Sequence, residues 1–89
     1  MDTKENWLVE LTAEESDGQT RARARLRLTG YETWWGTGNA RLNPADKDVT
    51  MIGEEIAIAR ALSDLAGKLL HSAEHGIEDI THAPVHLHM

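Results

Sequence analysis

Apolar and polar side chains alternate in two neighbouring stretches near the start of the chain. Trp7, Val9 and Leu11 fall at every second position, and residues 21–28 alternate arginine with alanine or leucine. Successive side chains of a strand point to opposite faces, so each stretch predicts a half-buried β-strand. The dipeptide Asp17-Gly18 between them is a strong turn signal. The pattern therefore predicts an antiparallel hairpin.

The turn also predicts how the two strands pair. Centring the hairpin on it gives five cross-strand pairs: Trp7 with Leu28, Val9 with Leu26, Leu11 with Ala24, Glu10 with Arg25, and Glu14 with Arg21. The first three pairs are apolar, and the last two bring opposite charges together. A slip of one residue would mix the two faces, so this register is the expected one.

A third strand is expected over residues 31–42. In this stretch Trp34, Gly36 and Gly38 share one face, which we place inward, and Trp35 lies on the other face with the arginines. Glycines on an inner face leave room for another backbone to come close, most simply a helix.

One long helix is predicted from residue 52 to about residue 72, with Thr50 as its N-cap. Its apolar stripe, expected to face the sheet, follows a four-three-four spacing: Ile58, Leu62, Leu65 and Leu69. Four further apolar residues widen the stripe: Ile56, Ala59, Ala61 and Ala66. One more turn over 77–80 and an extended segment over 84–89 follow. The elements predict an α+β fold, a three-stranded antiparallel sheet packed by one long helix, with one domain over residues 1–81 and a tail over 82–89.

Length and charge narrow the functional classes. The chain has 89 residues, no cysteine and a net charge of −6. A domain of this size has a marginal core, which favours a partner subunit. The chain shows neither a long apolar stretch nor a signal-like start, so a cytoplasmic protein with no membrane contact is expected. The negative charge repels phosphates, so nucleic acid would need a local basic patch.

The arginine strand is the candidate for such a patch. Arg21, Arg23, Arg25 and Arg27 are four of the nine cationic side chains of the chain, and Trp35 is expected beside them. Such a row can follow an RNA backbone while the ring stacks a base. Two other interpretations stay open. The row can be a solvated face paired with glutamates, or a contact with a second copy of the chain.

Metal and catalytic motifs are weak. His71 and His75 lie one helical turn apart, but they lack the glutamate placement of the zinc-protease motif His-Glu-x-x-His, and the tail histidines His86 and His88 offer no fixed third ligand. No nucleophile signature is visible. The sequence therefore predicts neither an enzyme nor a structural metal nor a cofactor.

Three segments carry a family resemblance. Residues 36–46 (Gly-Thr-Gly-Asn-Ala-Arg-Leu-Asn-Pro-Ala-Asp), residues 52–55 (Ile-Gly-Glu-Glu) and residues 57–65 (Ala-Ile-Ala-Arg-Ala-Leu-Ser-Asp-Leu) resemble a small actinobacterial family with a fold like the double-stranded-RNA-binding domain. Some of its members are dormancy-associated. The resemblance implies a three-stranded sheet with a helix, a homodimer whose subunits can intertwine, and a similarity to ribosome hibernation factors. It implies no catalytic residue.

One departure limits what the resemblance implies. Domains that grip duplex RNA carry lysines at the start of the helix after the sheet, whereas this chain has Gly53-Glu54-Glu55 there. A fold likeness alone does not establish RNA binding. We expect a small non-enzymatic stress or dormancy protein that binds the ribosome or its RNA. The alternative is a dimeric protein-interaction module that binds no nucleic acid.

Overall fold

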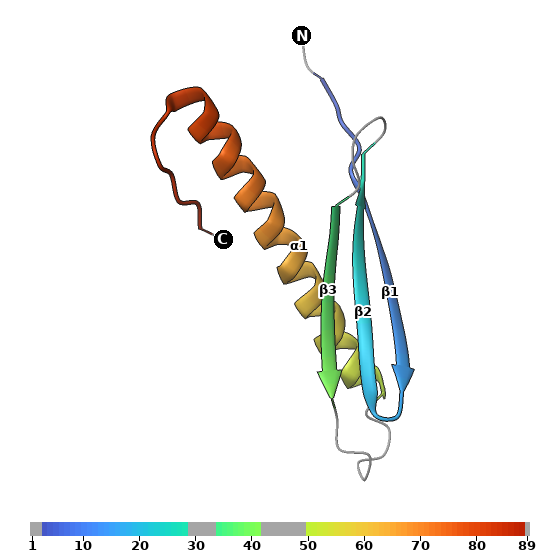
Figure 1. Cartoon of the computed structure of the whole chain (residues 1–89). Helices are drawn as coiled ribbons and strands as arrows, with labels where there is room; N and C mark the ends of the chain where they lie inside the picture. Colours follow the sequence, from blue (N-terminus) through green and yellow to red (C-terminus); the bar gives the residue numbers. More distant parts are fainter. Residues whose placement is uncertain (1–2, 29–33, 42–49, 89) are drawn as a thin grey trace.

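The computed structural model describes residues 3–28, 34–41 and 50–88. These residues form three strands and one helix: β1 (Leu8–Ser16), β2 (Gln19–Arg27), β3 (Trp34–Arg41) and α1 (Thr50–Thr81). The strands form one antiparallel sheet in the order β1-β2-β3, and α1 lies across one face of it (Figure 1). The predicted α+β architecture is confirmed. Within the described residues, no helix combines the length and apolarity needed to cross a membrane.

The hairpin forms in the predicted register. Four of the five predicted pairs form: Val9 with Leu26, Glu10 with Arg25, Leu11 with Ala24 and Glu14 with Arg21. The ladder ends at Leu8 with Arg27. The predicted pair of Trp7 with Leu28 lies one step beyond this last bridged pair. Asp17 and Gly18 both have positive φ angles, 52° and 74°. Two such residues in a two-residue loop match the twist of the flanking strands, which explains why Asp-Gly fixes the register.

The inner face of the sheet is lined by small residues. The buried core consists of Ala22, Ala24, Leu26, Ala40, Ala57, Ala61 and Leu65. A Cβ atom on Gly36 would collide with the carbonyl oxygen of Ala61, and one on Gly38 would collide with that of Ala57. The helix backbone therefore lies directly against β3, as predicted for these glycines. Positions 31–33 and 42 of the predicted strand lie outside the described residues.

The buried face of α1 differs from the predicted stripe. Gly53, Ala57, Ala61 and Leu65 are its buried residues, each four positions from the next. Of the predicted stripe, Ala61 and Leu65 are buried and Leu62 is 39% exposed. Four others are half-buried: Ile56, Ile58, Ala66 and Leu69. The stripe is therefore wrong at Leu62 and at Ala59, which is also exposed. Because the two glycines let the helix approach so closely, only small side chains fit beneath it, and the larger ones lie on its flank.

The helix is also longer than predicted. It continues past residue 72 and through Gly76 to Thr81, and its last turns extend beyond the sheet (Figure 1). His82, the residue after the helix, has a left-handed φ of 60°, and its amide donates to the carbonyl of Glu78 at 2.7 Å. A left-handed residue followed by Pro84 is a common helix stop. The missed length has a simple cause, since a lone glycine in a helix costs only about 1 kcal/mol.

Candidate functional site: the arginine face

The face of the sheet turned away from α1 carries the arginine row, and we call it the arginine face. Arg21, Arg23, Arg25 and Arg27 alternate along β2 with the buried residues of the same strand. Because β2 is the central strand, the row follows the middle of this face. Arg21, Arg23 and Arg27 are exposed and Arg25 is half-buried. The arginines therefore lie on the predicted face of the sheet, and in a single chain this face is open to solvent.

Trp35 lies on the arginine face, as its parity predicts. It pairs with Arg25 across the β2–β3 ladder. The guanidinium carbons of Arg23 and Arg25 lie 4.9 and 4.8 Å from the centroid of its ring. Cations at this distance are attracted to the ring by its quadrupole. Trp35 therefore orients two guanidiniums. The sequence pattern predicts only that its ring stacks a base.

The glutamates opposite the row do not neutralise it. Glu10 stands opposite Arg25 and Glu14 opposite Arg21 in the ladder. Among the described residues, however, the ion pairs are those of Lys68 with Asp64 and of His86 with Glu74, and none involves an arginine of this face. The Nε atom of Arg25 is buried and has no hydrogen-bond partner there. The guanidiniums of Arg21, Arg23 and Arg27, which are exposed, remain available to an acceptor from outside the chain.

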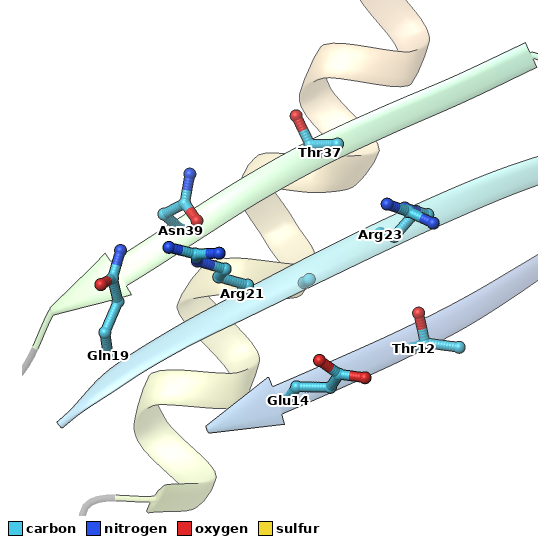
Figure 2. A pocket seen from close by; sticks show the side chains of 8 residues that line it. Thr12, Glu14, Gln19, Arg21, Arg23, Thr37 and Asn39 are labelled. Atoms are coloured by element: carbon cyan, nitrogen blue, oxygen red, sulfur yellow. The ribbon is translucent and has the colours of Figure 1, made fainter. Parts of the chain in front are cut away.

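A hollow opens beside the arginine row. It has a volume of about 510 Å³, and its polar lining comes from all three strands: Thr12, Glu14, Gln19, Arg21, Arg23, Thr37 and Asn39. Figure 2 shows these side chains on the side of the sheet opposite the helix, with Arg21 near Gln19 and Asn39. Guanidiniums bind phosphate in a bidentate manner, and amides and hydroxyls bind sugar and base edges. The hollow lies in the size range of small-molecule sites.

The outer edge of β3 is capped by α1. Arg60, Asp64 and Lys68 follow one another at four-residue steps along the helix, and each binds the strand backbone. Arg60 Nη1 donates to the carbonyl of Asn39 at 2.6 Å, the amide of Thr37 donates to Asp64 Oδ2 at 2.9 Å, and Lys68 Nζ donates to the carbonyl of Trp35 at 2.7 Å.

This cap closes an edge that would otherwise offer free hydrogen-bonding groups. It also fixes the backbone of three residues that carry side chains of the arginine face, Trp35, Thr37 and Asn39. Asp64 and Lys68 also form an ion pair with each other within the helix, at 3.2 Å. The sequence pattern did not predict that these side chains bind the strand. The sequence signal for this cap is the four-residue spacing of Arg60, Asp64 and Lys68, which runs next to the buried series of α1.

Asp64 gives the cap a pH dependence. The amide of Thr37, and then Lys68, hold the pKa of its carboxyl below the ordinary value. A lowered pKa in the folded state adds stability above the ordinary aspartate pKa of about 3.9, and this stability is lost as pH falls through the folded value. We expect Asp64→Asn to be less stable than the parent in urea at pH 7, and the difference to shrink below pH about 3.9. A difference that grows with acid would contradict this assignment.

The opposite edge of the sheet is open. On β1, Val9 is 46% exposed and Leu11 is 42% exposed, although both belong to the inner face. Trp7, just before the strand, is 53% exposed. The helix lies mainly over β2 and β3, so most of the inner face of β1 is left uncovered, apart from Ala13, which packs against the core (Figure 1). The chain thus presents an apolar strip along its β1 edge, separate from the arginine face.

The fold and this surface define a small α+β protein, with a helix on one side of a three-stranded sheet and an arginine row on the other. A family model described as Rv2632c-like matches residues 5–86. The chain belongs to the Rv2632c-like family. The family match does not address the likeness to double-stranded-RNA-binding domains or the link to dormancy, so both stay predictions.

Its relatives include mycobacterial proteins. The chain is 48% identical over 83 residues to "Uncharacterized protein Mb1767" of Mycobacterium bovis, covering 93% of this chain and 87% of that one. It is 51% identical over 77 residues to "Uncharacterized protein Rv2632c" of Mycobacterium tuberculosis, covering 86% and 82%. The solved structure "Crystal Structure of Rv2632c" matches with a TM-score of 0.82 and 46% identity, over 93% of this chain and 98% of that chain.

Proposed function

We propose that the arginine face binds RNA of the ribosome, and that the protein acts as a small non-enzymatic stress or dormancy protein in the manner of a hibernation factor. One observation carries the proposal. The arginines of β2 lie in a row along the middle of the sheet, three of them exposed, and no ion pair within the described part of the chain involves them.

The geometry of the row suits an RNA strand. Alternate residues of a strand recur at roughly 6.6–6.8 Å, so the row offers cations at a regular interval along one line. A sheet surface with an aromatic residue and polar side chains is a common platform for single-stranded RNA. Here the hollow supplies groups for a sugar or a base beside the row of cations.

The remaining charge restricts RNA to this face. The net charge of −6 repels phosphate over much of the surface. At the start of α1, Glu54 is half-buried and Glu55 is exposed, so carboxylates stand where duplex-binding domains present lysines. The proposed ligand is therefore a single-stranded or looped segment of ribosomal RNA rather than a duplex.

Cosedimentation with ribosomes tests the proposal. We expect Arg23→Glu with Arg25→Glu to abolish cosedimentation while the circular dichroism spectrum stays near that of the parent. The melting temperature should fall modestly, because half-buried Arg25 contacts Trp35 and a glutamate in its place stands opposite Glu10. Binding by the parent should fall steeply with added salt, since phosphate contacts release counterions. Free single-stranded RNA should compete for the protein better than duplex RNA of the same length.

Two controls sharpen this experiment. Lys4→Glu reverses one charge, as each arginine-to-glutamate change does, but at an exposed residue before the sheet. It should leave ribosome binding near the parental level. Arg23→Lys with Arg25→Lys keeps the charge but loses the planar guanidiniums, so it should bind weakly. Unchanged ribosome binding by the glutamate variant would overturn the proposal. Loss of folding in that variant would show that the arginines are structural.

A second candidate function rests on the uncovered β1 edge. Exposed Val9 and Leu11 favour a dimeric protein-interaction module, in which a second copy covers this apolar strip without any nucleic acid. Light scattering should then report about twice the chain mass at micromolar concentration. Leu11→Lys, on the inner face, should give a monomer, whereas Thr12→Lys, on the opposite face of the same strand, should not. A monomeric parent would exclude this candidate.

A further inference from the structure

His71 and His75 bring two ring nitrogens together on the exposed part of α1. Their Nε2 atoms lie 3.0 Å apart, and the rings meet edge to face with centroids 4.5 Å apart. Both residues are exposed. In the neutral pair one Nε2 donates a hydrogen and the other accepts it. An ion bound by both nitrogens would take the place of that hydrogen, with each ring protonated on Nδ1.

This separation is the one that a shared metal ion requires. Imidazole nitrogens bind zinc-like ions at about 2.0–2.1 Å, so two of them on one ion lie roughly 2.9 Å apart at a right angle and roughly 3.3 Å apart at a tetrahedral angle. We propose that His71 and His75 form a two-nitrogen chelating site for a first-row divalent transition metal ion. Cu²⁺ should bind most tightly, followed by Ni²⁺ and Zn²⁺.

The protein supplies two ligands to the ion, and water molecules fill the remaining coordination positions of the ion. Within the described residues, no group of three or more histidine, cysteine, aspartate or glutamate side chains is placed to hold a metal ion. The histidines lie in an open groove of about 710 Å³, which Trp34, Gly67 and Ser72 also line. Lys68, the nearest cation along the helix, is bound to Asp64 and to the carbonyl of Trp35.

Binding would stiffen the part of α1 that the sheet does not support. Leu65 is the last buried residue of the helix, and the turns that follow extend beyond the sheet (Figure 1). An ion held by residues 71 and 75 joins adjacent helical turns. Since it binds the folded helix and not the extended chain, it stabilises those turns by linkage. This role differs from that of a structural metal, because the core forms without it.

The tail histidines are the rival ligands. His86 Nδ1 lies 3.6 Å from Glu74 Oε2, and His82 and His88 lie nearby in the sequence. The helix variant, His71→Ala with His75→Ala, removes the proposed site. The tail variant, His82→Asn with His86→Ala and His88→Ala, keeps the proposed site and removes the rivals. Asparagine at 82 tolerates the left-handed backbone there.

Titration of the full chain with Cu²⁺, Ni²⁺ and Zn²⁺ salts tests the proposal. We expect one high-affinity ion per chain in the parent and in the tail variant, and an affinity lower by at least about tenfold in the helix variant and in His75→Ala alone. The Cu²⁺ electron paramagnetic resonance spectrum of the tail variant should show coupling to two nitrogens. Added ion should slow amide hydrogen exchange over residues 66–81 in the parent but not in the helix variant.

The same measurements can overturn it. If the helix variant binds as tightly as the parent and the tail variant does not, the ion belongs to the tail. If the tail variant binds no ion beyond weak millimolar association, the histidine pair is a hydrogen bond and no metal site. Both variants change only exposed or tail residues, so their circular dichroism spectra without metal should match the parent.

Discussion

Replacing Gly38 with alanine should unfold the protein or lower its free energy of unfolding by at least about 3 kcal/mol. A Cβ atom there would collide with the carbonyl oxygen of Ala57 and the amide nitrogen of Ala61. Both are backbone atoms of α1, so they cannot move aside without moving the helix away from the sheet. Urea unfolding followed by circular dichroism measures the loss.

Gly67→Ala is the matched control. Gly67 lies within the same helix, but an added Cβ atom meets nothing within 4 Å. Alanine should therefore stabilise the protein by up to about 1 kcal/mol, because it favours the helix and restricts the unfolded chain. If Gly38→Ala were as stable as Gly67→Ala, the close contact between α1 and β3 would be wrong.

Leu65→Ala should cost about 2–5 kcal/mol, whereas Leu62→Ala should cost about 1 kcal/mol or less. Leu65 is 3% exposed and belongs to the core, while Leu62 is 39% exposed on the flank of α1. Truncation of the first leaves a cavity, and truncation of the second removes area that is already partly in water. Thermal melting of the two variants, compared at equal protein concentration, gives the difference.

The comparison also tests whether a second chain covers the flank of α1 that carries Leu62. If Leu62→Ala costs as much as Leu65→Ala, Leu62 is covered in solution by something outside the single chain. Repeating the melts over a range of protein concentrations separates the cases, since only a loss of subunit contact depends on concentration. Equal costs that do not change with concentration would instead contradict the assigned helix face.

The hairpin of β1 and β2 could be predicted from the sequence in detail. Its register follows from two local facts: Asp-Gly accepts the two positive φ angles of a tight turn, and the faces of the hairpin differ in chemistry at every step. The position of Trp35 on the arginine face follows from the same alternation along β3. Such inferences need only neighbours in the sequence and the period of a strand.

The helix face and the β3 cap could not be predicted in this way. The bulky residues Ile58 and Leu62 suggested the buried face, but the distance between helix and strand decides which residues fit, and Gly36 and Gly38 set that distance. The cap joins side chains to backbone atoms 21 to 33 residues away. No local pattern encodes such contacts, although the spacing of Arg60, Asp64 and Lys68 is visible afterwards.

The arginine face was predicted in its residues but not in its electrostatics. Arg21, Arg23, Arg25 and Arg27 were placed together by parity, and the structure brings them together with Trp35. The sequence also indicated ion pairs with Glu10 and Glu14, which the described residues do not form. The strand register fixes the positions of two opposed Cα atoms, but long side chains can adopt many rotamers. In this structure Arg23 and Arg25 contact the ring of Trp35 instead of the glutamates.

Because of the cap on β3, a strand from another chain can extend the sheet only at the β1 edge. A strand added at β3 would have to displace contacts from Arg60, Asp64 and Lys68, whereas a strand added at β1 would displace none of them. Two chains that meet at their β1 edges expose only capped edges to a third. In such a pair strand addition would terminate, so pairing at β1 would protect a chain with an exposed apolar strip against open-ended fibre formation.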